Sequence, residues 1–189
     1  MDHNFVVEGY GLRLRPVAAS DASFIYEMRQ DSQLNEFVGN APKNFESQIT
    51  WQKEYMHRAG DFYFIIEIAS LREPIGTIAL YELSKGAAEW GRWILKSHRE
   101  AACASAILIY DFGFEVLSLD KIYCRTVDQN STVLGFHRSF GASYVGVDGN
   151  VEIKNKNYGL IRYEINSPDW QSLKSKNDRL AKSAARFYQ

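Results

Sequence analysis

The order of apolar and polar positions along this chain predicts alternating strands and helices. Residues 12–16 alternate leucine with arginine before a proline, the period-two pattern of a strand with one buried face. Residues 62–68 form an apolar run with a single charge, as expected for a strand covered on both faces. In chain order we expect a strand ending at Pro16, a helix capped by Ser20 or Asp21 and ending near Gln30, a loop over 31–44, a helix over 45–58, and strands over 62–68, 75–83 and 89–95.

The turns between the last three of these strands are short. Glu73-Pro74 and Lys85-Gly86 supply them, so the three strands should be adjacent and antiparallel. A helix over 101–116 and a strand over 121–127 follow, and a strand-helix-strand crossover implies that strands 89–95 and 121–127 are parallel.

The last third of the chain predicts a helix and a closing hairpin. Asn130 can cap a helix that Gly141 ends. Strands over 145–153 and 158–165 should join through a turn at 154–157. The charged tail from residue 167 onward is expected to be a loose or helical appendage.

The junction between strand 89–95 and the next helix has the composition of an anion site. Residues 96–99 are polar and basic, and residues 101–106 are small. The first turn of a helix has main-chain N–H groups without intrahelical partners, and small side chains there let a phosphate approach. Arg99 would add a cation. The residues alone fit an ordinary crossover, with alanines present for packing, equally well.

Length and charge exclude several classes of protein. A chain of 189 residues suits one soluble domain, with a core over about residues 11–166 and a tail over 167–189. The 22 basic and 23 acidic residues nearly cancel, which argues against nucleic-acid or membrane partners. The chain has no apolar run of the roughly 20 residues that span a bilayer and no evident signal peptide, so we expect a cytoplasmic protein.

The two cysteines do not indicate a disulfide framework or a metal site. Cys103 and Cys124 lie in no CxxC or Cys/His ligand spacing. Cys124 fits a core position in strand 121–127. Cys103 lies at the head of helix 101–116, where a helix N-terminus lowers the pKa of a thiol, so a nucleophilic role is a minor alternative.

Two sequence patterns resemble the GNAT acetyltransferase superfamily. Arg99-x-x-Ala102-x-Ala104 is similar to its pyrophosphate loop, although Ala102 stands where glycine is usual. The segments AAEWGRWIL and LSLDKIYCRTVDQNSTVLGFHRSFGA resemble the branch of ribosomal-protein N-terminal and nucleotide-sugar amine acetyltransferases. The resemblance implies an α/β (α+β) fold with a mixed central sheet of about six or seven strands, about four helices and a splayed central strand pair.

The same resemblance implies acetyl-CoA as the co-substrate, with no metal. Pantetheine would lie between the splayed strands, and the diphosphate would lie at the head of the helix. The expected contacts are Trp93, Ile94, Leu95, Arg99, Glu100, Ala101, Ala102, Cys103, Ala104, Ser105, Asn130 and Arg138.

Acetyl transfer to an amine needs a base for the amine and a proton for the departing thiolate. The resemblance places Glu89 as the base, with Glu82 in reserve, and a solvated carboxylate at a strand end is the alternative for Glu89. His137 lies where relatives place a proton-donating tyrosine, and the free pKa of histidine is close to working pH. A buried helix histidine without proton transfer is equally compatible.

The acceptor is less defined by sequence. A small amine or nucleotide-linked amino sugar would use aromatic and polar side chains near the loop over 31–44. The expected set is Phe37, Asn40, Trp51, Tyr55, Tyr81, Glu82 and Trp90. A protein N-terminus would instead use the acidic residues Glu36, Glu46 and Glu82. A non-catalytic CoA-binding or interaction module is a third interpretation, and a homodimer is compatible with the sequence.

Overall fold

In the computed structural model, which describes residues 3–96 and 100–188, the strands form one mixed sheet. Its order is β1-β2-β3-β4-β5-β6-β8-β7, and β5 and β6 are its parallel pair. The strands are β1 (Val7–Gly9), β2 (Leu12–Pro16), β3 (Phe62–Ile68), β4 (Glu73–Ser84), β5 (Ala87–Leu95), β6 (Lys121–Val127), β7 (Ser143–Ile153) and β8 (Lys156–Asn166).

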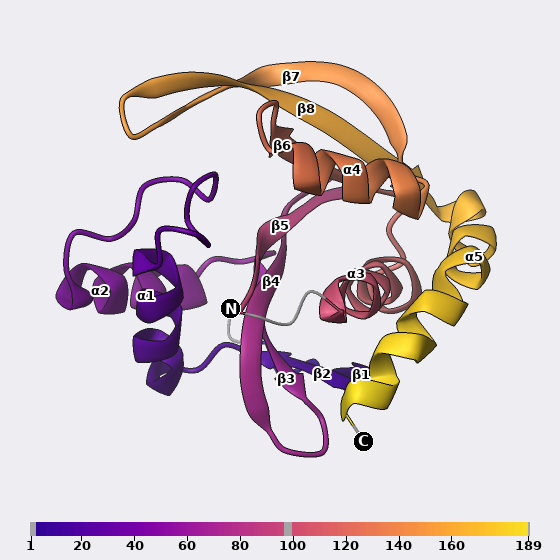
Figure 1. The fold of residues 1–189 in the computed structure, drawn as a ribbon, viewed down its shortest axis with the longest axis horizontal. Coiled ribbons are helices and arrows are strands. Elements are labelled where there is room, and N and C mark those ends of the chain that lie inside the picture. Colours follow the sequence, from indigo (N-terminus) through magenta and orange to yellow (C-terminus); the bar gives the residue numbers. More distant parts are fainter. Residues whose placement is uncertain (1–2, 97–99, 189) are drawn as a thin grey trace.

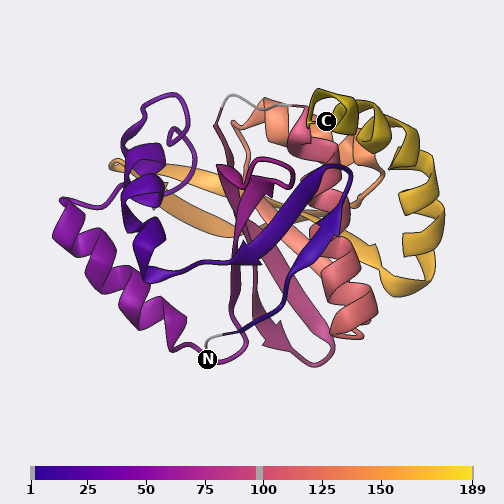
Figure 2. The ribbon, with the colours of Figure 1, turned by 90° about the horizontal axis from the view of Figure 1, so that it is seen from below.

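Helices cover both faces of this sheet (Figures 1 and 2). One face carries α1 (Ala22–Gln30) and α2 (Phe45–Met56), and the other carries α3 (Ala101–Asp111) and α5 (Ser167–Ala185). The remaining helix, α4 (Ser131–Phe140), leads into the β7–β8 hairpin. Short 3-10 turns lie at Ala19–Asp21 and Arg186–Tyr188, and a π-helical turn at Phe112–Val116 extends α3.

The two faces have separate cores, as the period of a strand requires. Along β3, Phe64 and Ile66 face the core that includes α3, whereas Tyr63 and Ile65 face the core that includes α1 and α2. All four side chains are buried, which explains why the sequence shows this strand as a continuous apolar run.

Strands β5 and β6 separate after a short parallel contact. Their pairing ends at Glu89 and Tyr123, so Trp90–Leu95 have no partner on β6. The register between β4 and β5 shifts between Thr77 and Ala79, where Arg92 has a φ of 49°. The Thr77 hydroxyl Oγ1 donates to the Arg92 carbonyl at 2.9 Å. This β-bulge bends β5 and thereby opens the sheet beside Trp93.

The β7–β8 hairpin and the loop over 31–44 meet over this opening. The hairpin turns at Lys154 and Asn155, which both have positive φ. The Lys154 ammonium donates to Asn35 Oδ1 at 3.0 Å, and its main-chain N–H donates to Asn40 Oδ1 at 3.1 Å. Two segments that are far apart in sequence therefore lie side by side (Figure 1).

Most elements follow the expected order, with three corrections. The sheet has eight strands rather than six or seven, because β1 adds an edge strand over residues too few to show a period. Glu73-Pro74 already belongs to β4, and the turn lies at 69–72 with Arg72 at positive φ. The described residues form five α-helices rather than about four, since the tail is helical.

The tail helix α5 packs on α3. The Trp170 side chain is buried, and its indole Nε1 donates to Asp111 Oδ1 at 2.9 Å.

Gly141 ends α4 with a φ of 106°, in the left-handed conformation that favours glycine. Among the described helices, none combines the length and the apolar character that crossing a membrane requires.

Candidate active site

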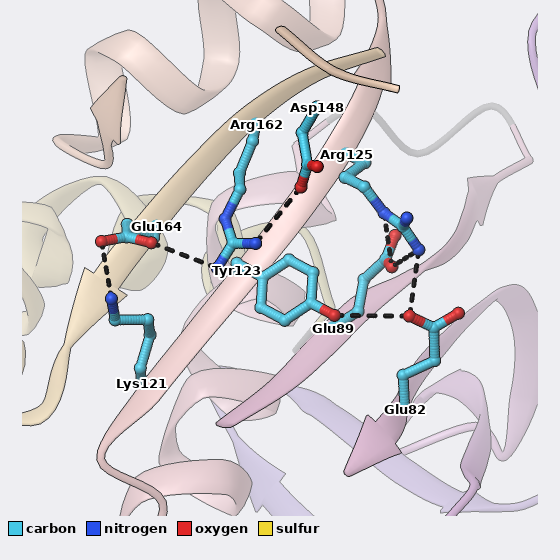
Figure 3. Close-up of polar contacts among 8 residues, drawn as sticks. All are labelled: Glu82, Glu89, Lys121, Tyr123, Arg125, Asp148, Arg162 and Glu164. Atoms are coloured by element: carbon cyan, nitrogen blue, oxygen red, sulfur yellow. Dashed lines mark hydrogen bonds and ion pairs between the residues drawn. The ribbon is translucent and has the colours of Figure 1, made fainter. Parts of the chain in front are cut away.

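Glu89 lies where β5 and β6 begin to separate (Figure 3). Its side chain is almost fully buried. Arg125 on β6 donates to Glu89 Oε2 from Nε at 2.8 Å and also from Nη2. The Tyr81 hydroxyl on β4 donates to Glu89 Oε1 at 3.1 Å. Burial raises the pKa of Glu89, and the Arg125 guanidinium opposes that rise. A carboxylate with a raised pKa is a stronger base than a free one.

A second carboxylate shares Arg125 with Glu89. Arg125 Nη2 donates to Glu82 Oε2 at 3.0 Å, and the Tyr123 hydroxyl donates to the same oxygen at 3.3 Å (Figure 3). The Arg162 guanidinium lies 4.0 Å from the centre of the Tyr123 ring. Glu82 is exposed, so the buried Glu89 is the carboxylate whose protonation the protein controls.

A cavity of about 290 Å³ lies beside this pair. Tyr81 and Arg125 line it, whereas Glu89 lies behind them. The remaining wall comes from α1, β5, β6, α4, the loop over 31–44 and the β7–β8 hairpin. Its volume is at the lower end of the range for small-molecule sites.

His137 on α4 lines the cavity and is buried. The His137 ring nitrogen Nε2 lies 3.2 Å from Thr126 Oγ1 and 3.4 Å from Cys124 Sγ. Burial lowers the pKa of His137 to about 4. The free pKa of histidine therefore does not apply to His137, because α4 packs this imidazole among Trp90, Phe136 and Tyr163. At neutral pH the ring is uncharged.

The tryptophans of β5 form the inner wall. The Trp90 Nε1 donates to the Tyr110 hydroxyl at 2.8 Å, and Trp93 Nε1 donates to Ser105 Oγ at 3.2 Å. Both residues line the cavity. Ile94 is buried and Leu95 is half-buried, and neither lines it. Gly91 and Arg92 line it as well, so β5 presents four consecutive residues to the opening, as the bulge at Arg92 allows.

The head of α3 is partly described. Arg99 lies outside the described residues. Glu100 occupies the N-cap position, and its Oε1 accepts from the Tyr188 hydroxyl at 3.0 Å. Ala101 and Ala104 are fully buried, and Ser105 Oγ donates to the Ala102 carbonyl at 3.1 Å. Ala102 lies in the regular helix, so its Cβ is accommodated without strain.

The Cys103 thiol does not have the low pKa that its helix position suggested. Burial raises the pKa of Cys103 to about 11, and the sulfur faces the Asn177 carbonyl of α5 at 3.7 Å. Because the side chain points into the helix interface rather than into the cavity, a nucleophilic role has no structural basis.

Of the two CoA contacts expected around α4, one lines the cavity and the other does not. Asn130 caps the helix, with Oδ1 accepting from the Val133 N–H at 3.2 Å, and lines the cavity. Arg138 is exposed and does not line it.

The residues expected to bind the acceptor also divide into those that line the cavity and those that do not. Phe37, Tyr81 and Trp90 line the cavity. Asn40 instead fastens the hairpin, and Glu82 binds Arg125. Trp51 and Tyr55 stack on each other with ring centres 5.0 Å apart, outside the cavity.

Three functional candidates were missed in the sequence, and one of them is Arg125 on β6, which donates to Glu89. Arg29 on α1 and Arg92 on β5 both line the cavity. The signal for Arg92 was present, because it is the one charged residue in the apolar run over 90–95. Arg29 gave no signal, since a basic residue in the last turn of a helix is usually solvated. Among the described residues, no group of three or more His, Cys, Asp or Glu side chains could hold a metal ion.

Comparison with known proteins places this geometry in a family. Residues 11–143 match the family described as "Acetyltransferase (GNAT) domain". No curated protein matches the sequence.

Solved structures give the same answer. A nucleotide-linked sugar GNAT, the apo form of FdhC, is 28% identical with a TM-score of 0.80, over 95% of this chain and 99% of that one. A GCN5-related N-acetyltransferase from Brucella melitensis is 18% identical with a TM-score of 0.81, over 94% and 85%. The spermidine N-acetyltransferase of Vibrio cholerae, in complex with CoA and spermine, is 19% identical with a TM-score of 0.76, over 86% and 99%.

Proposed function

The chain belongs to the GNAT acetyltransferase family, and we propose that it transfers the acetyl group of acetyl-CoA to the primary amine of a small molecule, specifically a nucleotide-linked amino sugar. The observation that carries this proposal is the cavity between the separated strands, with a buried carboxylate behind its wall. The likeness to a nucleotide-linked sugar GNAT supports the choice of acceptor.

Glu89 is the proposed base. Glu89 does not line the cavity, but Tyr81 does, and the Tyr81 hydroxyl donates to Glu89 Oε1. Burial raises the pKa of Tyr81, so this hydroxyl stays protonated and can pass a proton. The acceptor ammonium would give one proton to the Tyr81 oxygen as Tyr81 gives its own to Glu89 Oε1. The amine would then be uncharged and nucleophilic.

Acetyl-CoA supplies the activated acetyl group when bound, and the residues that would hold it fit that role. The first turn of any α-helix has main-chain N–H groups without intrahelical partners, and those at the head of α3 would bind the diphosphate. Trp93, Ile94 and Leu95 have no partner on β6, so their main chain can bind pantetheine amides and polarise a thioester carbonyl. Asn130 lines the same opening from α4.

His137 would act without a positive charge. Because burial lowers its pKa to about 4, an imidazolium is scarce at neutral pH. A neutral imidazole can still donate one N–H, and Thr126 on β6 fixes its orientation. We therefore assign His137 to hydrogen bonding within the site rather than to release of a full proton.

The enclosure of the cavity favours a small acceptor over a protein N-terminus. Lys154 ties the hairpin tip to the loop over 31–44 through Asn35 and Asn40. Val38 and Gly39 from this loop, and Val151 and Ile153 from β7, line the cavity. A peptide would need an open groove where these two segments now touch.

An acceptor screen tests the proposal. Purified protein with acetyl-CoA would be assayed for thiol release against nucleotide-linked amino sugars, free amino sugars, polyamines and peptide N-termini, with Glu89→Gln as the control for enzyme-dependent release. We expect the highest kcat/KM with a nucleotide-linked amino sugar. A higher kcat/KM with a peptide N-terminus would overturn the acceptor, and absence of thiol release with every amine would overturn the proposed activity.

A further inference from the structure

The three arginines that line the cavity have different partners. Arg125 is bonded to Glu89 and Glu82. Arg29 and Arg92 form no ion pair with any carboxylate among the described residues. Guanidinium groups inside proteins are normally matched by an anion, because removing a charge from water is costly. Two unmatched cations on one wall therefore point to an anion that arrives with a ligand.

Aromatic rings hold Arg92 in place. Its guanidinium carbon lies 4.2 Å from the centre of the Tyr81 ring and 4.6 Å from that of Tyr55. Arg92 Nη1 donates to the Tyr55 hydroxyl at 3.0 Å, and Trp51 stacks behind Tyr55. The contacts fix the plane of the guanidinium without neutralising it. Trp51 and Tyr55, which were expected to touch the acceptor, thus orient a cation instead.

Arg29 is held by the loop over 31–44. Its Nη2 donates to the Asn40 carbonyl at 2.6 Å, while its Nε is buried and has no hydrogen-bond partner among the described residues. Burial lowers the pKa of Arg29, and the charge of Arg92 lowers it further. The two cations are thus close enough to repel each other, and a bound anion would relieve that repulsion.

The acetyl donor would not supply this anion. Arg29 belongs to α1, and Arg92 donates to Tyr55 of α2. Helices α1 and α2 cover one face of the sheet, whereas α3 covers the opposite face (Figures 1 and 2). The diphosphate of the donor is expected at the head of α3. No carboxylate of the described residues lines the cavity, so a polycationic acceptor would find no counter-charge there.

We propose that Arg29 and Arg92 form a subsite for a phosphate or diphosphate group of the acceptor. Two guanidinium forks match a group with two negative charges and several oxygens better than a single carboxylate. The subsite would anchor the acceptor at one end, so that its amine faces Tyr81. This inference rests on the proposed function, because it assigns the acceptor chemistry of that same cavity.

A binding experiment tests the subsite without relying on turnover. Inorganic pyrophosphate, and UDP as a second probe, would be titrated calorimetrically into protein saturated with CoA, which occupies the donor site. We expect Arg29→Gln and Arg92→Gln each to weaken pyrophosphate binding about tenfold or more. The matched control Lys53→Gln, which removes an exposed charge from neighbouring α2, should leave it unchanged. Acetate should bind far more weakly.

Lysine variants and CoA affinity distinguish loss of the subsite from loss of the fold. Arg29→Lys and Arg92→Lys keep the charge and lose the planar fork, so they should bind pyrophosphate better than the glutamine variants. Each variant should retain the CoA affinity of the unaltered protein, which shows that the fold is intact. Pyrophosphate binding that is absent, or insensitive to all four substitutions, would overturn the subsite.

The two proposals fail in different ways. Thiol release with an amine that carries no phosphate, together with pyrophosphate binding that does not depend on Arg29 and Arg92, would refute the subsite alone. Pyrophosphate binding that depends on these arginines, without thiol release from any amine, would refute the proposed transfer and leave the subsite standing. A higher kcat/KM for spermidine than for a phosphate-bearing amine would contradict the subsite directly.

Discussion

The two charged walls of the cavity differ in one respect. On the paired wall, Arg125 is matched by Glu89 and Glu82. On the unpaired wall, Arg29 and Arg92 are matched by no described carboxylate. A paired wall holds its charges for internal use, such as moving a proton, whereas an unpaired wall presents charge to a ligand. The difference assigns the chemistry to one side of the cavity and recognition of the acceptor to the other.

The strands explain how both walls reach one cavity. Glu89 and Arg92 are three residues apart on β5, but the bulge at Arg92 changes which face of the sheet its side chain reaches. Glu89 then meets β6 through Arg125, and Arg92 meets α2 through Tyr55. In a regular strand, side chains three residues apart point to opposite faces, so the bulge places Arg92 on the face of Glu89, where Tyr81 contacts both.

Among changes to the paired wall, removal of the proposed base Glu89 should lower kcat the most. Glu89→Gln keeps the size of the side chain and loses the proton acceptor, so kcat should fall roughly a hundredfold or more. Steady-state kinetics measures this, with acetyl-CoA binding as the control for folding. An unchanged kcat would remove Glu89 from the mechanism. Tyr81→Phe tests the relay, since it keeps the ring beneath Arg92 and deletes only the hydroxyl.

Between the walls, the neutral His137 predicts loss of stability in acid. Its pKa is about 4 in the folded protein and about 6.5 when unfolded, so protons favour the unfolded chain as pH falls from 6.5 to 4. Between pH 7 and pH 5 the cost is about 2 kcal/mol. Urea unfolding at both pH values should show that His137→Asn loses less stability than the unaltered protein. An equal loss in both would contradict the buried, neutral imidazole.

Adding a carboxylate to the unpaired wall should convert it into a paired one. Val38 lines the cavity from the loop over 31–44, beside Gly39. Val38→Glu would give Arg29 and Arg92 an internal partner, and pyrophosphate binding should weaken about tenfold. Val38→Gln is the matched control for size and polarity, and calorimetry compares the two. Equal affinities in the two variants would show that charge on this wall does not select the ligand.

Removal of the Arg125 cation from the paired wall should shift the pH dependence of kcat/KM. Arg125 lowers the pKa of Glu89 against the effect of burial, so Arg125→Gln should raise that pKa. The base must be ionised to act, and the acidic limb of kcat/KM should therefore shift to higher pH. Profiles for the variant and the unaltered protein, measured with the same acceptor, give the shift. A shift to lower pH would mean that another group controls the limb.

Sequence reasoning found the elements that carry the site, because local patterns specify them. The period-two pattern gave β2, the apolar runs gave β3 and β5, and Asn130 and Gly141 gave the ends of α4. It also gave the parallel pairing of β5 with β6, which follows from the crossover through α3. Of the proposed site residues, those already named from the sequence are Glu89, His137, Tyr81, Trp93, Ile94, Leu95 and Asn130, and their roles remain proposals.

Sequence reasoning failed where a property depends on what surrounds a side chain. The pKa of His137 depends on the packing of α4, and that of Cys103 depends on α5. Arg29 and Trp51 are separated from Arg92 by many residues along the chain, so no local pattern relates them.

The sequence by itself therefore determined the order of strands and helices and the position of a carboxylate at the start of β5, because hydrophobic period, caps and turns act within a few residues. Only the tertiary structure decided which charges are paired. Arg125 meets Glu89 across two strands, whereas Arg92 is turned by a bulge toward aromatic rings of α2. Electrostatic matching depends on distance in space, which the order of residues does not record.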